Sequence, residues 1–164
     1  KLVFKPLMYL SVILMIFYWY YNNTILNKLL QTQKKSWFFI FGVLSALFLL
    51  FHVIFLGWSF ENEILAKGRR YFIVFFILFE VLAQAFLIRE IFKKKDDLKE
   101  FINKAIVYSK LIFVFLICIS TIFIFALLTV YNLDNKVDYI LEWNYFLILL
   151  IFYFLSSIMW KKIN

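Results

Sequence analysis

Apolar residues fill five long stretches of the chain, and polar or charged residues separate these stretches. They cover roughly residues 2–21, 37–58, 71–92, 106–131 and 139–160. Each holds about the 20 residues that an α-helix needs to cross a hydrocarbon core of about 30 Å. The runs lack the alternation of a membrane β-strand, and a helix satisfies its backbone groups within the segment. The pattern therefore predicts an all-α protein, a single transmembrane domain over residues 1–164 with about five membrane-spanning helices.

The composition indicates that lipid surrounds the apolar surface of these helices. Hydrophobic residues make up 65% and aromatic residues 23% of the 164 residues, and the mean hydropathy is +0.89. A soluble domain is about half apolar, and a small domain buries the smallest fraction of its surface. Residue types with AT-rich codons (Phe, Ile, Lys, Tyr, Asn and Met) form half of the chain. This bias indicates an AT-rich genome, as in mitochondria and some bacteria.

Lysine and arginine are distributed unequally over the connecting segments. If successive helices cross in opposite directions, one side carries 11 of these residues and the other carries 6, while Lys110 is expected to snorkel from just inside the bilayer. The positive-inside rule then places the amino terminus outside and the carboxyl terminus inside. The expected location is the mitochondrial inner membrane or a bacterial plasma membrane. Trp19 is one of several Trp and Tyr residues expected as anchors at the membrane surface.

The segment between the third and fourth apolar stretches is a charged hairpin. Asp97 and Glu100 have the spacing of a capping box, which predicts a helix start just ahead of Phe101. A contact with anionic lipid headgroups or a partner protein is expected for four lysines of this segment, Lys93, Lys94, Lys95 and Lys99. The alternative is a solvated loop that only sets the topology.

Three polar residues form a candidate intramembrane site. Glu80 lies near the middle of the third stretch, Gln84 follows four residues later on the same helix face, and His52 lies near the end of the second stretch. At 1.5 Å per residue, His52 and Glu80 lie roughly 9 and 14 Å below the same membrane face. They are therefore expected to meet directly or through one water. Burying a charged carboxylate is costly, so Glu80 is expected to be neutral or to share a proton with His52. A structural Glu80 bonded to a neighbouring helix is the alternative.

Other reactive residue types point to structural roles. Cys118 is the single cysteine and His52 the single histidine, so neither a disulfide within the chain nor a bis-histidine haem site is available. Ser120 and Thr121 are expected to bond their own backbone or a neighbouring helix. We therefore predict no catalytic residue, no metal and no cofactor held by this chain, and expect bound structural phospholipids.

One short stretch resembles a known family. Residues 67–71 read Lys-Gly-Arg-Arg-Tyr, and Glu80 is followed by Val81. This is similar to the entry into the third helix of subunit three of the haem-copper cytochrome c oxidases. The resemblance implies a buried carboxylate at Glu80 close to the proton-uptake side, in a lipid-binding subunit that holds no metal. It covers about fifteen residues; the family usually has seven helices, its histidines are missing here, and its orientation is the opposite.

The sequence therefore predicts a non-catalytic, structural and lipid-binding subunit of a larger membrane complex, one of the respiratory chain. Its partners would be membrane lipids and other membrane subunits, and no nucleic acid. Such a chain would not be an enzyme on its own, although it could belong to a redox enzyme complex. The alternative is a small transporter or lipid-handling protein with its polar site at His52 and Glu80.

Overall fold

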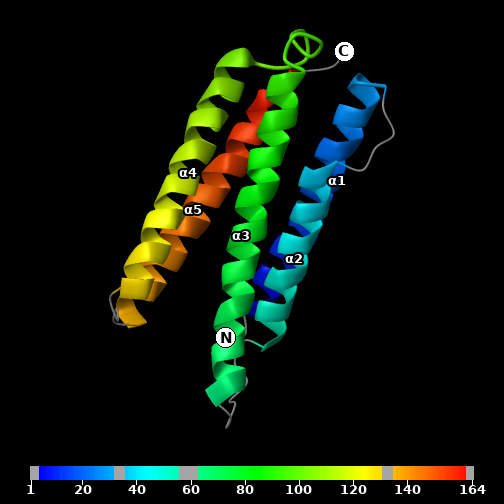
Figure 1. The fold of residues 1–164 in the computed structure, drawn as a ribbon. Helices are drawn as coiled ribbons and strands as arrows, with labels where there is room; N and C mark the ends of the chain where they lie inside the picture. The colour runs from blue at the N-terminus through cyan, green and yellow to red at the C-terminus, as the bar shows by residue number, and fades with distance from the viewer. Residues whose placement is uncertain (1–3, 32–35, 56–62, 131–134, 162–164) are drawn as a thin grey trace. The chain divides into compact units, whose positions relative to one another are not determined.

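The structure, a computed structural model, describes residues 4–31, 36–55, 63–130 and 135–161, with the side chains of 4, 63–70, 121–143 and 146 outside this description. These residues form helices α1 (Phe4–Leu29), α2 (Trp37–Phe55), α3 (Glu63–Lys93), α4 (Lys104–Val130) and α5 (Asn135–Met159), shown in Figure 1. No strand occurs in these ranges apart from one isolated bridge. The prediction of an all-α protein is confirmed for the described part of the chain.

Helices α1 and α3 extend furthest beyond the apolar stretches that predicted them. Helix α1 continues from residue 21 to Leu29, and α3 begins at Glu63, eight residues ahead of the predicted start. The prediction followed the ends of the apolar runs, but a helix needs only its backbone hydrogen bonds and can carry polar side chains. Helix α1 is followed by Gln31 in the left-handed conformation (φ 50°), a common way to terminate a helix.

Length and composition mark fewer membrane spans than the sequence analysis predicts. Among the described residues, Trp37–Phe55 and Tyr71–Lys93 are long and apolar enough to cross a bilayer, and Leu147–Met159 is a shorter apolar stretch. Helix α1 carries Tyr, Trp and Asn residues in its second half, which lower its apolar character. The prediction of about five spans is thus matched by two segments on these criteria.

The chain divides into two compact units, residues 1–87 and 88–164. The first contains α1, α2 and most of α3; the second contains the end of α3 with α4 and α5. Because the boundary falls inside the continuous helix α3, the prediction of one domain stays a prediction. Each unit is described by itself below.

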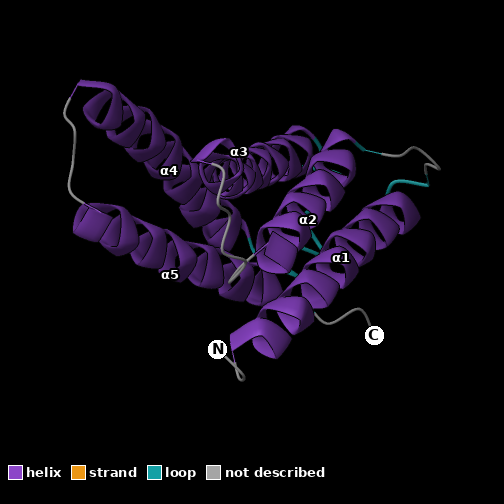
Figure 2. Cartoon of the chain, turned by 90° about the horizontal axis from the view of Figure 1, so that it is seen from below, coloured by secondary structure: helices purple, strands orange, loops and turns teal. Residues whose placement is uncertain are grey.

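In the first unit, α1 packs closely along α2, as Figure 2 shows. The contact centres on the indole of Trp19, which is fully buried and packs on Gly42 so closely that a Cβ there would overlap the ring. Phe38 borders the same indole, with 6.2 Å between ring centroids. Trp19 is therefore a packing residue and not the surface anchor predicted from the sequence. Because Gly42 has no side chain, it leaves the space that the Trp19 ring occupies.

Phenylalanine rings join α2 to α3 in the same unit. Phe48 contacts Phe79 and Phe75, each with 5.3 Å between ring centroids, and Phe55 contacts Phe72 at 5.6 Å. Residues further along α2 meet residues earlier on α3, so the two helices run antiparallel. Offset aromatic pairs of this kind contribute about 0.5–1.5 kcal/mol each beyond the area they bury. Together they fix one register between the two helices.

In the second unit, α4 does not begin at the capping box predicted from Asp97 and Glu100. The N-cap is Asn103, whose Oδ1 accepts a hydrogen bond from the Ala105 amide at 3.1 Å. Asp97 instead lies in the preceding turns, 3.9 Å from the ammonium of Lys94. The turns between α3 and α4 delay the helix start, so the Asp97–Glu100 spacing does not coincide with it.

Replacing Gly42 with Ala should weaken the packing of α1 on α2. Alanine is favoured over glycine within a helix by roughly 1 kcal/mol, so the overlap with Trp19 has to outweigh this gain. We expect a net loss of about 1–3 kcal/mol, seen as a lower midpoint of thermal unfolding in detergent micelles. In a Trp19→Leu background the same substitution should cost much less, because the smaller side chain leaves space. Equal stability of Gly42→Ala and the parent protein in both backgrounds would contradict this packing.

Candidate functional site

Three buried polar side chains meet between α2 and α3. Glu80 is fully buried, and its two carboxyl oxygens have separate partners. Oε2 lies 2.6 Å from the hydroxyl of Ser45 on α2, and Oε1 accepts a hydrogen bond from Gln84 Nε2 at 2.6 Å. Ser45 and Gln84 are buried as well. The carboxyl group of Glu80 is thus hydrogen-bonded to its own helix and to the neighbouring one.

Helix geometry explains how these residues come together. Glu80 and Gln84 are four residues apart on α3, which places them on one face, as the sequence analysis predicts. Ser45 lies on the buried stripe of α2, beside the small side chain of Ala46. Small residues on buried faces permit close approach of helix backbones. The 2.6 Å contact between Ser45 and Glu80 is consistent with such an approach.

The hydrogen-bond pattern suits a protonated carboxyl group. The hydroxyl of Ser45 also lies 2.9 Å from the carbonyl oxygen of Gly42, which can only accept a hydrogen bond. A serine hydroxyl has one proton to donate. A protonated Glu80 can donate from Oε2 to Ser45, which then donates to the Gly42 carbonyl. Each of these three groups then has a hydrogen-bond partner. An ionised Glu80 would compete with Gly42 for the single Ser45 proton.

The amide of Gln84 is only partly satisfied. Its nitrogen donates to Glu80, but its Oε1 is buried and accepts no hydrogen bond within the described part of the chain. A buried acceptor without a partner costs about 1–3 kcal/mol. The cluster therefore has one further position at which a hydrogen-bond donor would be stabilising.

His52 lies further along α2, where it is half-buried. It follows Ser45 by seven residues, which corresponds to two helical turns or about 10 Å along the axis. Phe51, next to it, and Phe55, three residues later, both contact Phe72 of α3. Ser45, which the sequence analysis did not single out, is an α2 side chain that bonds Glu80. A meeting of His52 with Glu80 stays a prediction.

The four lysines predicted as headgroup contacts differ in their surroundings. Lys93 and Lys99 are exposed, and Lys94 is paired with Asp97. Lys95 is half-buried, with its ammonium 4.8 Å from the centroid of the Phe92 ring. Lys95 is therefore held against the end of α3, unlike the exposed lysines around it.

A second buried polar contact joins α4 to α5. Lys110 is fully buried; its ammonium donates to the hydroxyl of Ser156 and lies 4.0 Å from the centroid of the Phe152 ring. Ser156 in turn lies 3.0 Å from the carbonyl oxygen of Phe152. This corrects the expectation that Lys110 snorkels to the surface: the partners on α5 let it stay inside. Sequence reasoning missed Ser156 because nothing in its local pattern distinguishes it from the neighbouring Ser157.

Of the remaining candidate nucleophiles, Ser120 makes the expected backbone hydrogen bond. Ser120 donates to the carbonyl of Ile117 at 2.9 Å, as predicted, and Cys118 is half-buried. The side chain of Thr121 lies outside the described residues. Within the ranges that the structure describes, no three His, Cys, Asp or Glu side chains gather to hold a metal ion.

Replacing Glu80 with Gln should preserve stability, and replacing it with Leu should not. The Gln amide can donate to Ser45 and accept from Gln84, as the protonated acid does. Leu would leave Ser45 and Gln84 without this partner, so we expect a loss of about 1–3 kcal/mol in thermal unfolding in micelles. Infrared spectra should show a protonated carboxylic acid band that the Gln variant lacks. A Gln variant as unstable as the Leu variant, without that band in the parent, would indicate an ionised Glu80.

Comparison with known proteins assigns no family to the chain. No family model, curated protein or solved structure matches it. The resemblance of residues 67–81 to subunit three of the haem-copper oxidases therefore stays a prediction.

Proposed function

We propose that the chain is a non-catalytic, structural and lipid-binding subunit of a larger membrane complex of the respiratory chain. The observation that carries this proposal is the buried hydrogen-bond cluster at Glu80. Both of its carboxyl oxygens are bonded within the chain, to Ser45 and Gln84, and the group is fully buried. A polar group enclosed in this way contributes to helix association, because its alternative in an apolar medium is an unsatisfied group.

The apolar surface of the chain supports the same proposal. Phe17 of α1 is 63% exposed and Phe154 of α5 is 66% exposed, and many other large apolar side chains are exposed on the helices. Water-soluble monomers rarely expose large contiguous apolar patches. In the proposed setting, lipid tails and the helices of partner subunits cover these side chains.

In this proposal about five helices span the bilayer. Helices α1, α4 and α5 contain 26, 27 and 25 residues, more than the roughly 20 that a span requires. The excess of Lys and Arg on one set of connections orients the amino terminus outside and the carboxyl terminus inside. The membrane is the mitochondrial inner membrane or a bacterial plasma membrane.

A small transporter or lipid-handling protein is the second candidate. It is favoured by the buried Oε1 of Gln84, which accepts no hydrogen bond within the described residues. A transported proton or polar substrate would supply the missing donor. In that case Glu80, Gln84 and His52 would line its route.

Native mass spectrometry of the protein, extracted gently from its own membrane, tests the first proposal. We expect an assembly of fixed stoichiometry that contains other membrane subunits and bound lipid. Deletion of those subunits should lower the amount of the chain in the membrane, because its apolar faces lose their partners. Glu80→Gln should remain in the assembly, since it keeps the hydrogen bonds to Ser45 and Gln84.

A free monomer or small homo-oligomer would contradict the subunit proposal. Transport in reconstituted vesicles then separates the alternatives. A transporter that uses the Glu80 proton should lose transport in Glu80→Gln while remaining folded. Unchanged transport in that variant would remove Glu80 from the mechanism.

A further inference from the structure

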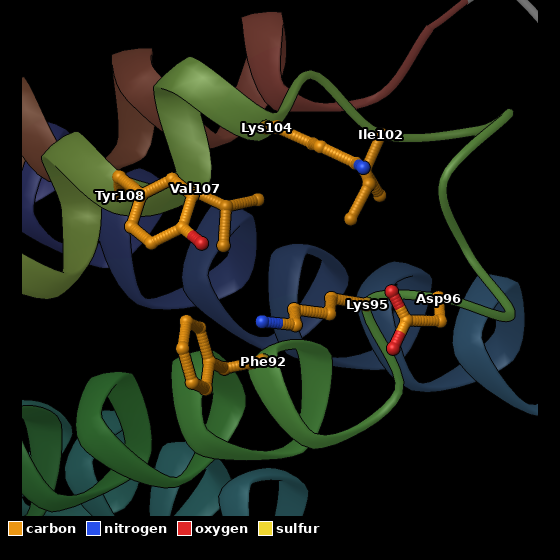
Figure 3. A pocket seen from close by; sticks show the side chains of 7 residues that line it. All are labelled: Phe92, Lys95, Asp96, Ile102, Lys104, Val107 and Tyr108. Atoms are coloured by element: carbon orange, nitrogen blue, oxygen red, sulfur yellow. The ribbon is translucent and has the colours of Figure 1, made fainter.

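The connection between α3 and α4 borders a half-open cavity of about 110 Å³. It lies within the second unit, and Figure 3 shows the side chains that line it. The lining residues come from the end of α3, the turns and the first turns of α4: Phe92, Lys95, Asp96, Ile102, Lys104, Val107 and Tyr108. Its volume is that of a few water molecules, which is enough for one phosphoryl group.

The cavity is lined by both apolar and basic residues. Ile102 and Val107 are its buried apolar lining residues. In Figure 3 the ammonium of Lys95, which lies in the turns after α3, points towards the rings of Phe92 and Tyr108. Lys104 extends from the first turn of α4 on the opposite side. Two ammonium groups therefore border the space.

The charge around the cavity favours an anion. Asp96 contributes one carboxylate against the two lysines, and its side chain is exposed to solvent. The amino-terminal end of α4, which begins at Lys104, adds the positive end of a helix dipole. Tyr108 carries a hydroxyl that can donate to an anionic oxygen. The ligand chemistry is thus that of a phosphate or a similar oxyanion.

A track of exposed apolar side chains leads away from the cavity along α4. Tyr108 is 46% exposed, and it is followed by Ile112 at 60% and Phe115 at 64%. These residues are four and seven positions after Tyr108, which itself lies four positions after Lys104. Positions spaced in this way share one helix face. A single face of α4 therefore begins with a cation and continues with apolar side chains.

The geometry points to a binding site for one anionic phospholipid. Its phosphate lies in the cavity between Lys95 and Lys104 within reach of the Tyr108 hydroxyl, and an acyl chain lies along Ile112 and Phe115. A free phosphate would use the cavity but not the apolar track. This inference rests on the proposed membrane location and names the headgroup that the proposed subunit holds. It selects Lys95 from the four predicted lysines and adds Lys104.

Lipid retention measured by native mass spectrometry tests the site. The full chain is reconstituted in bilayers of mixed phosphatidylglycerol and phosphatidylcholine, and in phosphatidylcholine alone. We expect one phosphatidylglycerol to remain bound per chain in preference to phosphatidylcholine. Lys95→Gln combined with Lys104→Gln should lower its occupancy roughly tenfold or more. Phe115→Ala should lower it less, because the headgroup contacts remain.

The matched control combines Lys93→Gln with Lys99→Gln. It removes the same charge from the same hairpin, but neither lysine lines the cavity. Unchanged lipid retention in this control supports the site. An equal loss in both double variants would show general attraction to an anionic surface and would overturn it. Thermal unfolding of both variants in phosphatidylcholine verifies that the loss does not come from unfolding.

Competition with inorganic phosphate distinguishes a phospholipid from a free phosphate as the ligand of the cavity. If it displaces the bound lipid at equal concentration, and Phe115→Ala has no effect, the cavity takes a free phosphate and the lipid inference is wrong. Failure of the wild-type chain to enter either bilayer would instead overturn the proposed membrane function, and the lipid site with it. Insertion without a preference for phosphatidylglycerol would overturn the lipid site alone.

Discussion

A carboxyl group between two apolar helices is stable only if its oxygens find hydrogen-bond partners, and this requirement shapes the first unit. Glu80 meets it with Gln84 on its own helix and Ser45 on α2. The second of these contacts ties α2 to one position along α3. The phenylalanine contacts on either side of it, from Phe41–Phe86 to Phe55–Phe72, follow the same antiparallel register. A slip by one turn would break the contact between Ser45 and Glu80 and leave a buried polar group without its partner, which costs about 1–3 kcal/mol.

The second unit holds a buried lysine in a similar way. Lys110 bonds the hydroxyl of Ser156, just as Glu80 bonds that of Ser45, and each serine is also within hydrogen-bonding distance of a carbonyl oxygen of its own helix. A serine on a buried helix face can therefore relay a hydrogen bond from a charged or acidic side chain to a backbone carbonyl. The ring of Phe152 adds a cation–π contact to Lys110. Each unit thus contains a buried polar contact that joins two helices.

Many large apolar side chains are exposed on the described helices, while lysines gather at the hairpin between α3 and α4. This separation of apolar and basic residues suits the proposed membrane location. Lys95 and Lys104 lie where the two kinds of surface adjoin. The proposed structural role and the proposed lipid site therefore follow from the same separation of apolar and charged residues.

The sequence by itself determined the features that depend on neighbouring residues. Long apolar runs predict helices because in apolar surroundings the backbone must form its hydrogen bonds within the segment. The four-residue spacing of Glu80 and Gln84 places both side chains on one helix face. The backbone bond of Ser120 is local in the same sense.

Only the tertiary structure decided which distant faces meet. In a helix that is apolar on all sides, no apolar stripe marks the face that packs inward. The sequence therefore did not single out Ser45 as the partner of Glu80, or Gly42 as the residue on which Trp19 packs. The burial of Lys110 depends on Ser156, 46 residues away, and the cavity at Lys95 depends on turns that delay the start of α4. These contacts arise from packing between helices, which residue type and spacing along a uniformly apolar chain leave undetermined.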